Sequence, residues 1–108
     1  MAAKLLETIY SELESIGVVQ TRSEFCTQWL GRSEGYVRTL RFCAQQPSID
    51  VLAVLSNRLR YYAKQYASKE GNANKAAARH FEALARDCDN DIEQRSSTVW
   101  IERAKEAI

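Results

Sequence analysis

The side chains best suited to a chemical task in this sequence are four arginines between residues 20 and 45: Arg22, Arg32, Arg38 and Arg41. A guanidinium group binds a phosphate or the edge of a guanine through two parallel hydrogen bonds. Residues 20–79 hold ten Lys or Arg residues against four acids, whereas the whole chain has a formal net charge of only +1. Such a basic middle is what binding to a phosphate backbone requires. The alternative is that each charge solvates the outer face of a helix.

Residues that could support nucleophilic catalysis or bind zinc are few and scattered. His80 is the only histidine, and the residues around it do not suggest a Ser-His-Asp or Cys-His-Asp arrangement. Cys26, Cys43 and Cys88 are widely spaced and form no C-x-x-C pair, which is typical of reduced thiols in a cytoplasm. A zinc site needs four ligands at close spacing, and His80 and Cys88 have no further partners.

Three aspartates, Asp87, Asp89 and Asp91, alternate along the chain as the ligands of a calcium loop do. However, no glycine and no terminal glutamate follow them at the required spacing, so we interpret them as a solvated helix end. The sequence also lacks a glycine-rich phosphate loop. We therefore predict no catalytic residues, no metal, no cofactor and no small-molecule substrate, and we do not expect an enzyme.

The arginines are placed by two short predicted helices that meet at a glycine. Thr21 and Glu24 form a Thr-x-x-Glu capping box that begins the first helix. Gly31 suits the position after a helix end, where a positive φ is favoured. Ser33 is expected to cap the second helix, which carries arginines on one side and apolar residues on the other. Two short helices joined by a glycine turn indicate a helix-turn-helix at about residues 21–43.

With Gly31 at the glycine of that turn, four apolar residues fall at the buried positions of the motif: Cys26, Leu30, Val37 and Leu40. In this respect the chain resembles small bacterial or phage helix-turn-helix transcriptional regulators. The spacing EFCTQWLGRSEGYVRTLR, followed by PSIDVLAVLSNRL, also looks like a family of short uncharacterised proteobacterial proteins. The first resemblance implies sequence-specific binding of duplex DNA, and the second implies no known chemistry.

In helix-turn-helix geometry, the first turns of the second helix enter the major groove. The residues expected to face the bases are Ser33, Glu34, Gly35, Arg38, Thr39 and Phe42. Arg38 is the main candidate for reading a base, together with Thr39 and Ser33, since arginine can bind guanine bidentately. The residues expected to contact phosphates are Arg22, Arg32 and Arg41.

The remaining helices follow from apolar periodicity, which predicts helices over residues 3–15, 49–67 and 75–94. Residues 96–98, Ser-Ser-Thr, either interrupt the last helix or let it continue with reduced propensity. We therefore predict an all-α fold of five or six helices in a single domain, 1–108. Within it, residues 1–67 form the helix-turn-helix core and residues 72–108 form C-terminal helices.

A homodimer is expected because one short recognition helix buries too little surface by itself. The C-terminal helices offer the means of pairing, through four residues: Phe81, Leu84, Ile92 and Trp100. The competing hypothesis is a helical protein-interaction module or inhibitor without DNA binding. The acidic stretch at 87–93 and the terminal Trp100 favour that alternative.

Membrane and export signals are not expected. The chain has no run of about 18 apolar residues, so no segment should span a membrane. Its first 17 residues carry three glutamates with a helical period, unlike a secretory signal. Together with the cysteine pattern, this predicts a cytoplasmic protein.

Overall fold

The computed structural model describes residues 2–107, and every regular element in that range is a helix. The elements are α1 (Ala2–Ile16), α2 (Arg22–Glu24), the π-helix η1 (Phe25–Trp29), α3 (Tyr36–Phe42), α4 (Ile49–Ala67) and α5 (Asn72–Ala107). The prediction of an all-α fold is confirmed.

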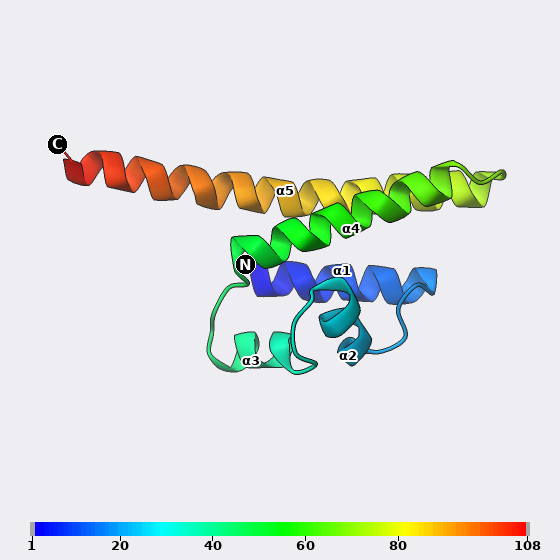
Figure 1. Ribbon diagram of the computed structural model, residues 1–108, viewed down its shortest axis with the longest axis horizontal. Coiled ribbons are helices and arrows are strands. Elements are labelled where there is room, and N and C mark those ends of the chain that lie inside the picture. Colours follow the sequence, from blue (N-terminus) through cyan, green and yellow to red (C-terminus); the bar gives the residue numbers. More distant parts are fainter. Residues whose placement is uncertain (1, 108) are drawn as a thin grey trace.

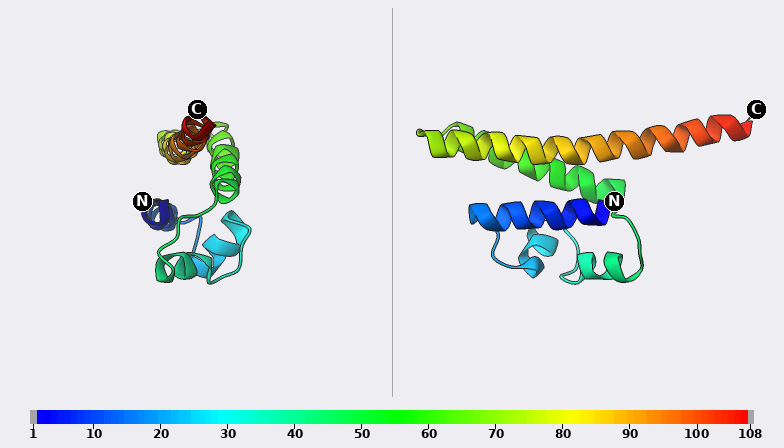
Figure 2. Two further views of the ribbon diagram at one scale, coloured as in Figure 1. Left: turned by 90° about the vertical axis from the view of Figure 1, so that its left-hand side faces the viewer. Right: turned by 180° about the vertical axis from the view of Figure 1, so that it is seen from behind.

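The helices lie in layers (Figures 1 and 2). Helices α4 and α5 form an antiparallel hairpin. Near the turn between them, the rings of Tyr66 and Phe81 lie 5.3 Å apart. Farther from the turn, Arg95 of α5 donates a hydrogen bond to the carbonyl of Pro47, just before α4. Helix α1 lies against the hairpin, and α2 and α3 lie on the opposite side of α1. The π-helix η1 also reaches α4 (Figure 2), where the Trp29 ring stacks on the Tyr62 ring at 4.9 Å. The C-terminal end of α5 extends beyond all other elements.

A single cluster of buried side chains joins these layers. Its members share near-zero exposure and come from α1, η1, α3, α4 and α5; they include Leu6, Ile9, Leu13, Phe25, Trp29, Val37, Leu40, Leu52, Leu55, Leu59, Phe81, Ala85 and Cys88. The apolar stripes of α1, α4 and α5 all face this cluster, so burial of those stripes stabilises the whole arrangement.

The long helices agree with the sequence expectations more closely than the short ones. The observed bounds of α4 match the predicted residues 49–67, and Ser48 caps it by accepting a hydrogen bond from the Val51 amide at 3.2 Å. Of the two alternatives left open at residues 96–98, the structure has the helix continue. There the Thr98 hydroxyl donates to the Gln94 carbonyl at 3.0 Å within a continuous α5.

The predicted helix-turn-helix segment differs from expectation in two places. Its first helix is α-helical only over three residues and then widens into η1, where the Leu30 amide bonds to the Phe25 carbonyl at 3.2 Å. Its second helix begins at Tyr36, so Ser33 is not its cap. Instead, the Ser33 carbonyl accepts from the Tyr36 amide at 3.1 Å in a turn. The cap at Thr21 and the positive φ of Gly31 (68°) are as expected.

Candidate nucleic-acid interface

The predicted DNA contacts lie on the outer surface of α3 and on the turn before it, except for Arg22, which lies in α2. All eight are exposed: Arg22, Arg32, Ser33, Glu34, Arg38, Thr39, Arg41 and Phe42. The inner side of the same helix packs into the core through Val37 and Leu40, which are 8% and 6% exposed. Helix α3 is therefore amphipathic, with its polar side free to meet a partner.

Helix α3 faces away from the hairpin. Figure 1 shows α1 between α3 and α5, so the C-terminal helix does not cover the predicted recognition surface. Phe42, the last residue of α3, is 91% exposed. The surface therefore combines an exposed apolar side chain with the positive charge of the neighbouring arginines.

A glutamate from α1 binds two of the predicted phosphate-contacting arginines. Glu7 Oε2 lies 2.5 Å from Arg22 Nη1, and Glu7 Oε1 lies 3.3 Å from Arg41 Nη1. The hydrogen bond to Glu7 raises the pKa of Arg22, whose guanidinium also lies 4.8 Å from the centre of the Tyr10 ring. One carboxylate, between the two guanidinium groups, thus holds α2 and α3 to α1.

Two residues, Arg38 and Glu34, make contacts with or from the turn before α3. A Cβ atom added at Gly35 would lie 3.0 Å from Arg38 Nη2, so a glycine there gives the guanidinium room to fold over the turn. Glu34 Oε2 accepts a hydrogen bond from the Ser23 hydroxyl at 2.9 Å, which ties the turn to α2. Arg32 lies over the Tyr36 ring at 5.8 Å.

A cleft of about 170 Å³ lies where α1, α2 and α3 meet. Its lining combines three arginines with two glutamates and a small apolar floor: Arg22, Arg38, Arg41, Glu7, Glu34, Cys26 and Val37. Arg38 therefore lines the same cleft as Glu7 and the two arginines that Glu7 binds. Of the two arginines of α3, Arg41 is paired with Glu7, whereas Arg38 has no ion pair within residues 2–107.

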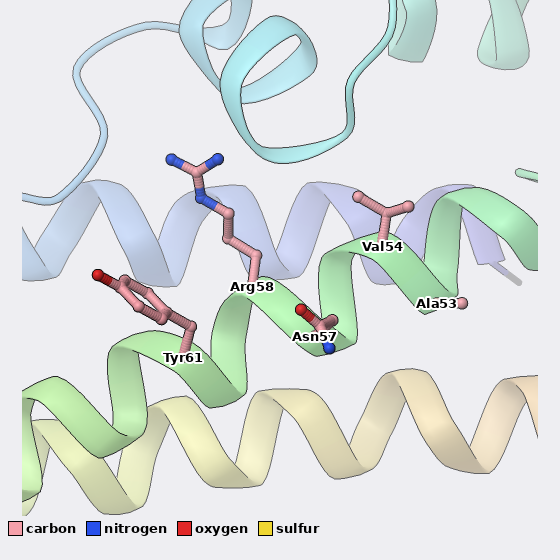
Figure 3. A pocket seen from close by; sticks show the side chains of 5 residues that line it. All are labelled: Ala53, Val54, Asn57, Arg58 and Tyr61. Atoms are coloured by element: carbon pink, nitrogen blue, oxygen red, sulfur yellow. The ribbon is translucent and has the colours of Figure 1, made fainter.

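A second surface, on the outside of α4, was missed by the sequence reasoning. An open groove of about 530 Å³ is lined by Ala53, Val54, Asn57, Arg58 and Tyr61 (Figure 3). Arg58 points from α4 toward η1, where its guanidinium lies 5.4 Å from the Trp29 ring, and Trp29 stacks on Tyr62 at 4.9 Å. The 4-and-3 spacing of Val54, Arg58 and Tyr61 marks one helix face and could have revealed this surface.

The residues predicted to mediate pairing fall into two groups. Phe81 and Leu84 are buried between α5 and the rest of the chain, so they belong to the core of a single molecule and not to a pairing surface. Ile92 is half-buried at the edge of that core. Trp100, by contrast, is 62% exposed on the projecting end of α5.

Several residues considered for catalysis or metal binding have structural roles instead, although Asp91 Oδ2 is buried without a hydrogen-bond partner from residues 2–107. His80 Nε2 lies 2.8 Å from Glu12 Oε2 and joins α5 to α1. Burial raises the pKa of the Cys88 thiol to about 12, with a further contribution from Asp89, so this thiol stays protonated. Asp89 is bound to Ser56 and Arg60 of α4. Among the residues that the structure describes, no three His, Cys, Asp or Glu side chains gather as a metal site would require.

The fold and this surface define an all-α protein in which a long helical hairpin carries a small unit ending in an exposed basic helix. The chain belongs to DUF6626, a family of unknown function, whose model matches residues 6–101. No curated protein and no solved structure matches the chain. Within residues 2–107, no helix is both long enough and apolar enough to cross a membrane.

Proposed function

We propose that the protein binds duplex DNA sequence-specifically, as a transcriptional regulator that inserts α3 into the major groove. The observation that supports this best is the two-sided character of α3. Val37 and Leu40 fix its inner side in the core, while Arg38 and Thr39 project from its outer side. An α-helix with its side chains is about 10–12 Å across, which fits a major groove about 12 Å wide, and the seven residues of α3 extend about 10 Å along the helix axis.

The exposed residues divide by task. Arg38, Thr39 and Ser33 read base edges, and Phe42 makes an apolar contact with a thymine methyl group. Arg32, at the turn, binds a phosphate. Arg22 and Arg41 bind phosphates after exchanging Glu7 for the DNA backbone, and they add affinity without sequence preference.

The test is selection from a random duplex pool at two salt concentrations, comparing the wild type with Arg38→Ala. A matched control is Arg79→Ala, which removes an exposed arginine from α5, away from α3. We expect a palindromic site to be enriched by the wild type and the control, with binding weakened by salt. Arg38→Ala should lose that enrichment, with a cost of about 1–3 kcal/mol at one base pair.

The other outcomes separate the alternatives. Salt-sensitive binding without enrichment would indicate a non-specific DNA-binding protein and would remove the base-reading role of Arg38. Absence of binding at both salt concentrations would contradict the proposal. The second candidate function, a helical protein-interaction module, would then be preferred, because Phe42 and Trp100 are large apolar side chains that remain exposed.

A further inference from the structure

The end of α5 is a helix without a neighbour in its own chain. Arg95 Nη1 donates to the Pro47 carbonyl at 2.6 Å, and every side chain from residue 98 to residue 106 is exposed. Figures 1 and 2 show this end running past the hairpin. Isolated helices of this length are marginal in water, so a helix here calls for packing against a partner.

The exposed end is apolar as well as unsupported. Val99, Trp100 and Ile101 are 45%, 62% and 40% exposed. Consecutive residues of a helix point about 100° apart, so these three side chains surround much of the helix, and tryptophan in particular contributes strongly to interfaces.

The side chains around Trp100 suit a second helix. Glu93, Ser97, Trp100 and Ala104 follow each other in steps of 4, 3 and 4, which places them on one stripe of a helix. The stripe has small residues on both sides of the tryptophan. The indole of one helix therefore has a hole to enter on an identical helix laid against it.

Charge decides the direction in which two such helices would lie. The two charges nearest the face of Trp100 have opposite signs: Glu93 lies seven residues before it and Arg103 three residues after it. The other nearby charges, Arg95, Glu102, Lys105 and Glu106, lie farther round the helix. In a parallel pair Glu93 would face Glu93 and Arg103 would face Arg103, which is repulsive. In an antiparallel pair centred near residue 98, each Glu93 lies beside Arg103 of the other copy, and each Trp100 covers Ser97 of the other copy.

We propose that two copies of this chain associate through the ends of α5, packed antiparallel around residue 98. The partner is a second copy because the stripe and its charges complement themselves under a two-fold axis. Within residues 2–107, neither Glu93 nor Arg103 is held in an ion pair, so both are available. The pairing goes beyond the proposed DNA binding and does not depend on it, although it would supply the two recognition helices of a palindromic site.

The test is sedimentation equilibrium of the full chain over a wide concentration range, without DNA. Four variants are compared with the wild type: Trp100→Ala, Glu93→Arg, Arg103→Glu, and the double variant with both charges exchanged. We expect Trp100→Ala to weaken the dimer by at least about 30-fold. Each single charge reversal should weaken it by about tenfold, and the double variant should return to within about threefold of the wild type.

The controls separate pairing from folding. Glu70→Arg reverses an exposed charge in the turn before α5 and should leave the dimer unchanged. Far-UV circular dichroism of each variant checks that the hairpin remains folded. A wild type that stays monomeric, a dimer insensitive to Trp100→Ala, or a double variant as weak as the single ones would each overturn the proposal. A stable dimer that binds no DNA would leave the pairing intact and remove only the proposed function.

Discussion

The α4–α5 hairpin and the segment from residue 21 to residue 43 are built by different means. The hairpin consists of long helices whose apolar stripes meet along their length, with a partly exposed polar link between them. In that link the Ser56 hydroxyl donates to Asp89 Oδ1 at 2.6 Å, and Arg60 Nη2 lies 2.6 Å from Asp89 Oδ2. The segment, by contrast, has three short elements, one of them a π-helix.

Short helices depend on what surrounds them. A helix of seven residues such as α3 has too few internal hydrogen bonds to persist alone. It is held by Val37 and Leu40 in the core and by the bond from Arg41 to Glu7. The comparison teaches that the hairpin is a scaffold specified by its own sequence pattern, whereas the basic surface is shaped by contacts with α1. The predictions below test this division.

The largest effect should come from the same substitution made once in each region. Phe81→Ala empties a fully buried site where α5 meets α4, and we expect it to lower the free energy of unfolding by about 3–5 kcal/mol. Phe42→Ala removes a ring that is 91% exposed, and its effect should stay within about 0.5 kcal/mol. Urea unfolding followed by circular dichroism measures both. Equal losses would mean that α3 is as much a part of the core as the hairpin is.

The sequence was sufficient to predict helices in both halves of the hairpin, but not their packing on each other, because helical signals are local and repeated. In α4, Ile49, Leu52, Leu55 and Leu59 recur at helical spacing over many turns, and Ser48 marks the start. Such a pattern determines both the helix and the side that it buries. The burial of Val37 and Leu40, and the turn at Gly31, followed from the same kind of local reasoning.

The details of the candidate site could not be predicted in this way. Glu7 is far along the chain from Arg22 and Arg41, and nothing in the local pattern selects it as their partner. The start of α3 at Tyr36, after a turn at Ser33, also departs from the capping preference of serine. The pairing role expected for Phe81 failed for a related reason: an apolar stripe predicts burial but does not say whether the partner lies in the same chain.

A smaller effect should come from the polar link of the hairpin. Burial opposes ionisation of Asp89, but hydrogen bonds from Arg60 and Ser56 outweigh it and lower the pKa of that carboxyl group. Because its pKa is lower in the folded state, the ionised group adds stability above its unfolded pKa, and this is lost as the pH falls through the folded pKa. We expect Asp89→Asn to cost about 1 kcal/mol at neutral pH, reduced by the partial exposure of the group.

The measurement is the free energy of unfolding as a function of pH. The difference between the wild type and Asp89→Asn should shrink below about pH 4. Asp87→Asn is the matched control, since Asp87 is exposed and two residues away. If the difference in the free energy of unfolding does not depend on pH, the charge of Asp89 makes no contribution to stability, and the cost of the substitution comes from the change in hydrogen bonding and packing.

The smallest effect on stability should come from Glu7, the carboxylate that joins α1 to α2 and α3. Glu7→Gln removes the negative charge that holds Arg22 and Arg41, so stability should fall by less than about 1 kcal/mol. If the proposed function is correct, the same change should raise the affinity for duplex DNA several-fold, because two guanidinium groups no longer have to leave an internal anion. The dependence of binding on salt should become steeper, since more phosphates are then neutralised.

Glu12→Gln provides the control for this last prediction, because Glu12 lies on the same helix but contacts His80 of α5. It removes the same charge from the chain without freeing either arginine, so its DNA affinity should rise less than that of Glu7→Gln. Equal gains in the two variants would trace the effect to net charge alone. A loss of affinity in Glu7→Gln would mean that the carboxylate serves chiefly to orient the arginines, and that the order it gives α2 and α3 outweighs its competition with phosphate.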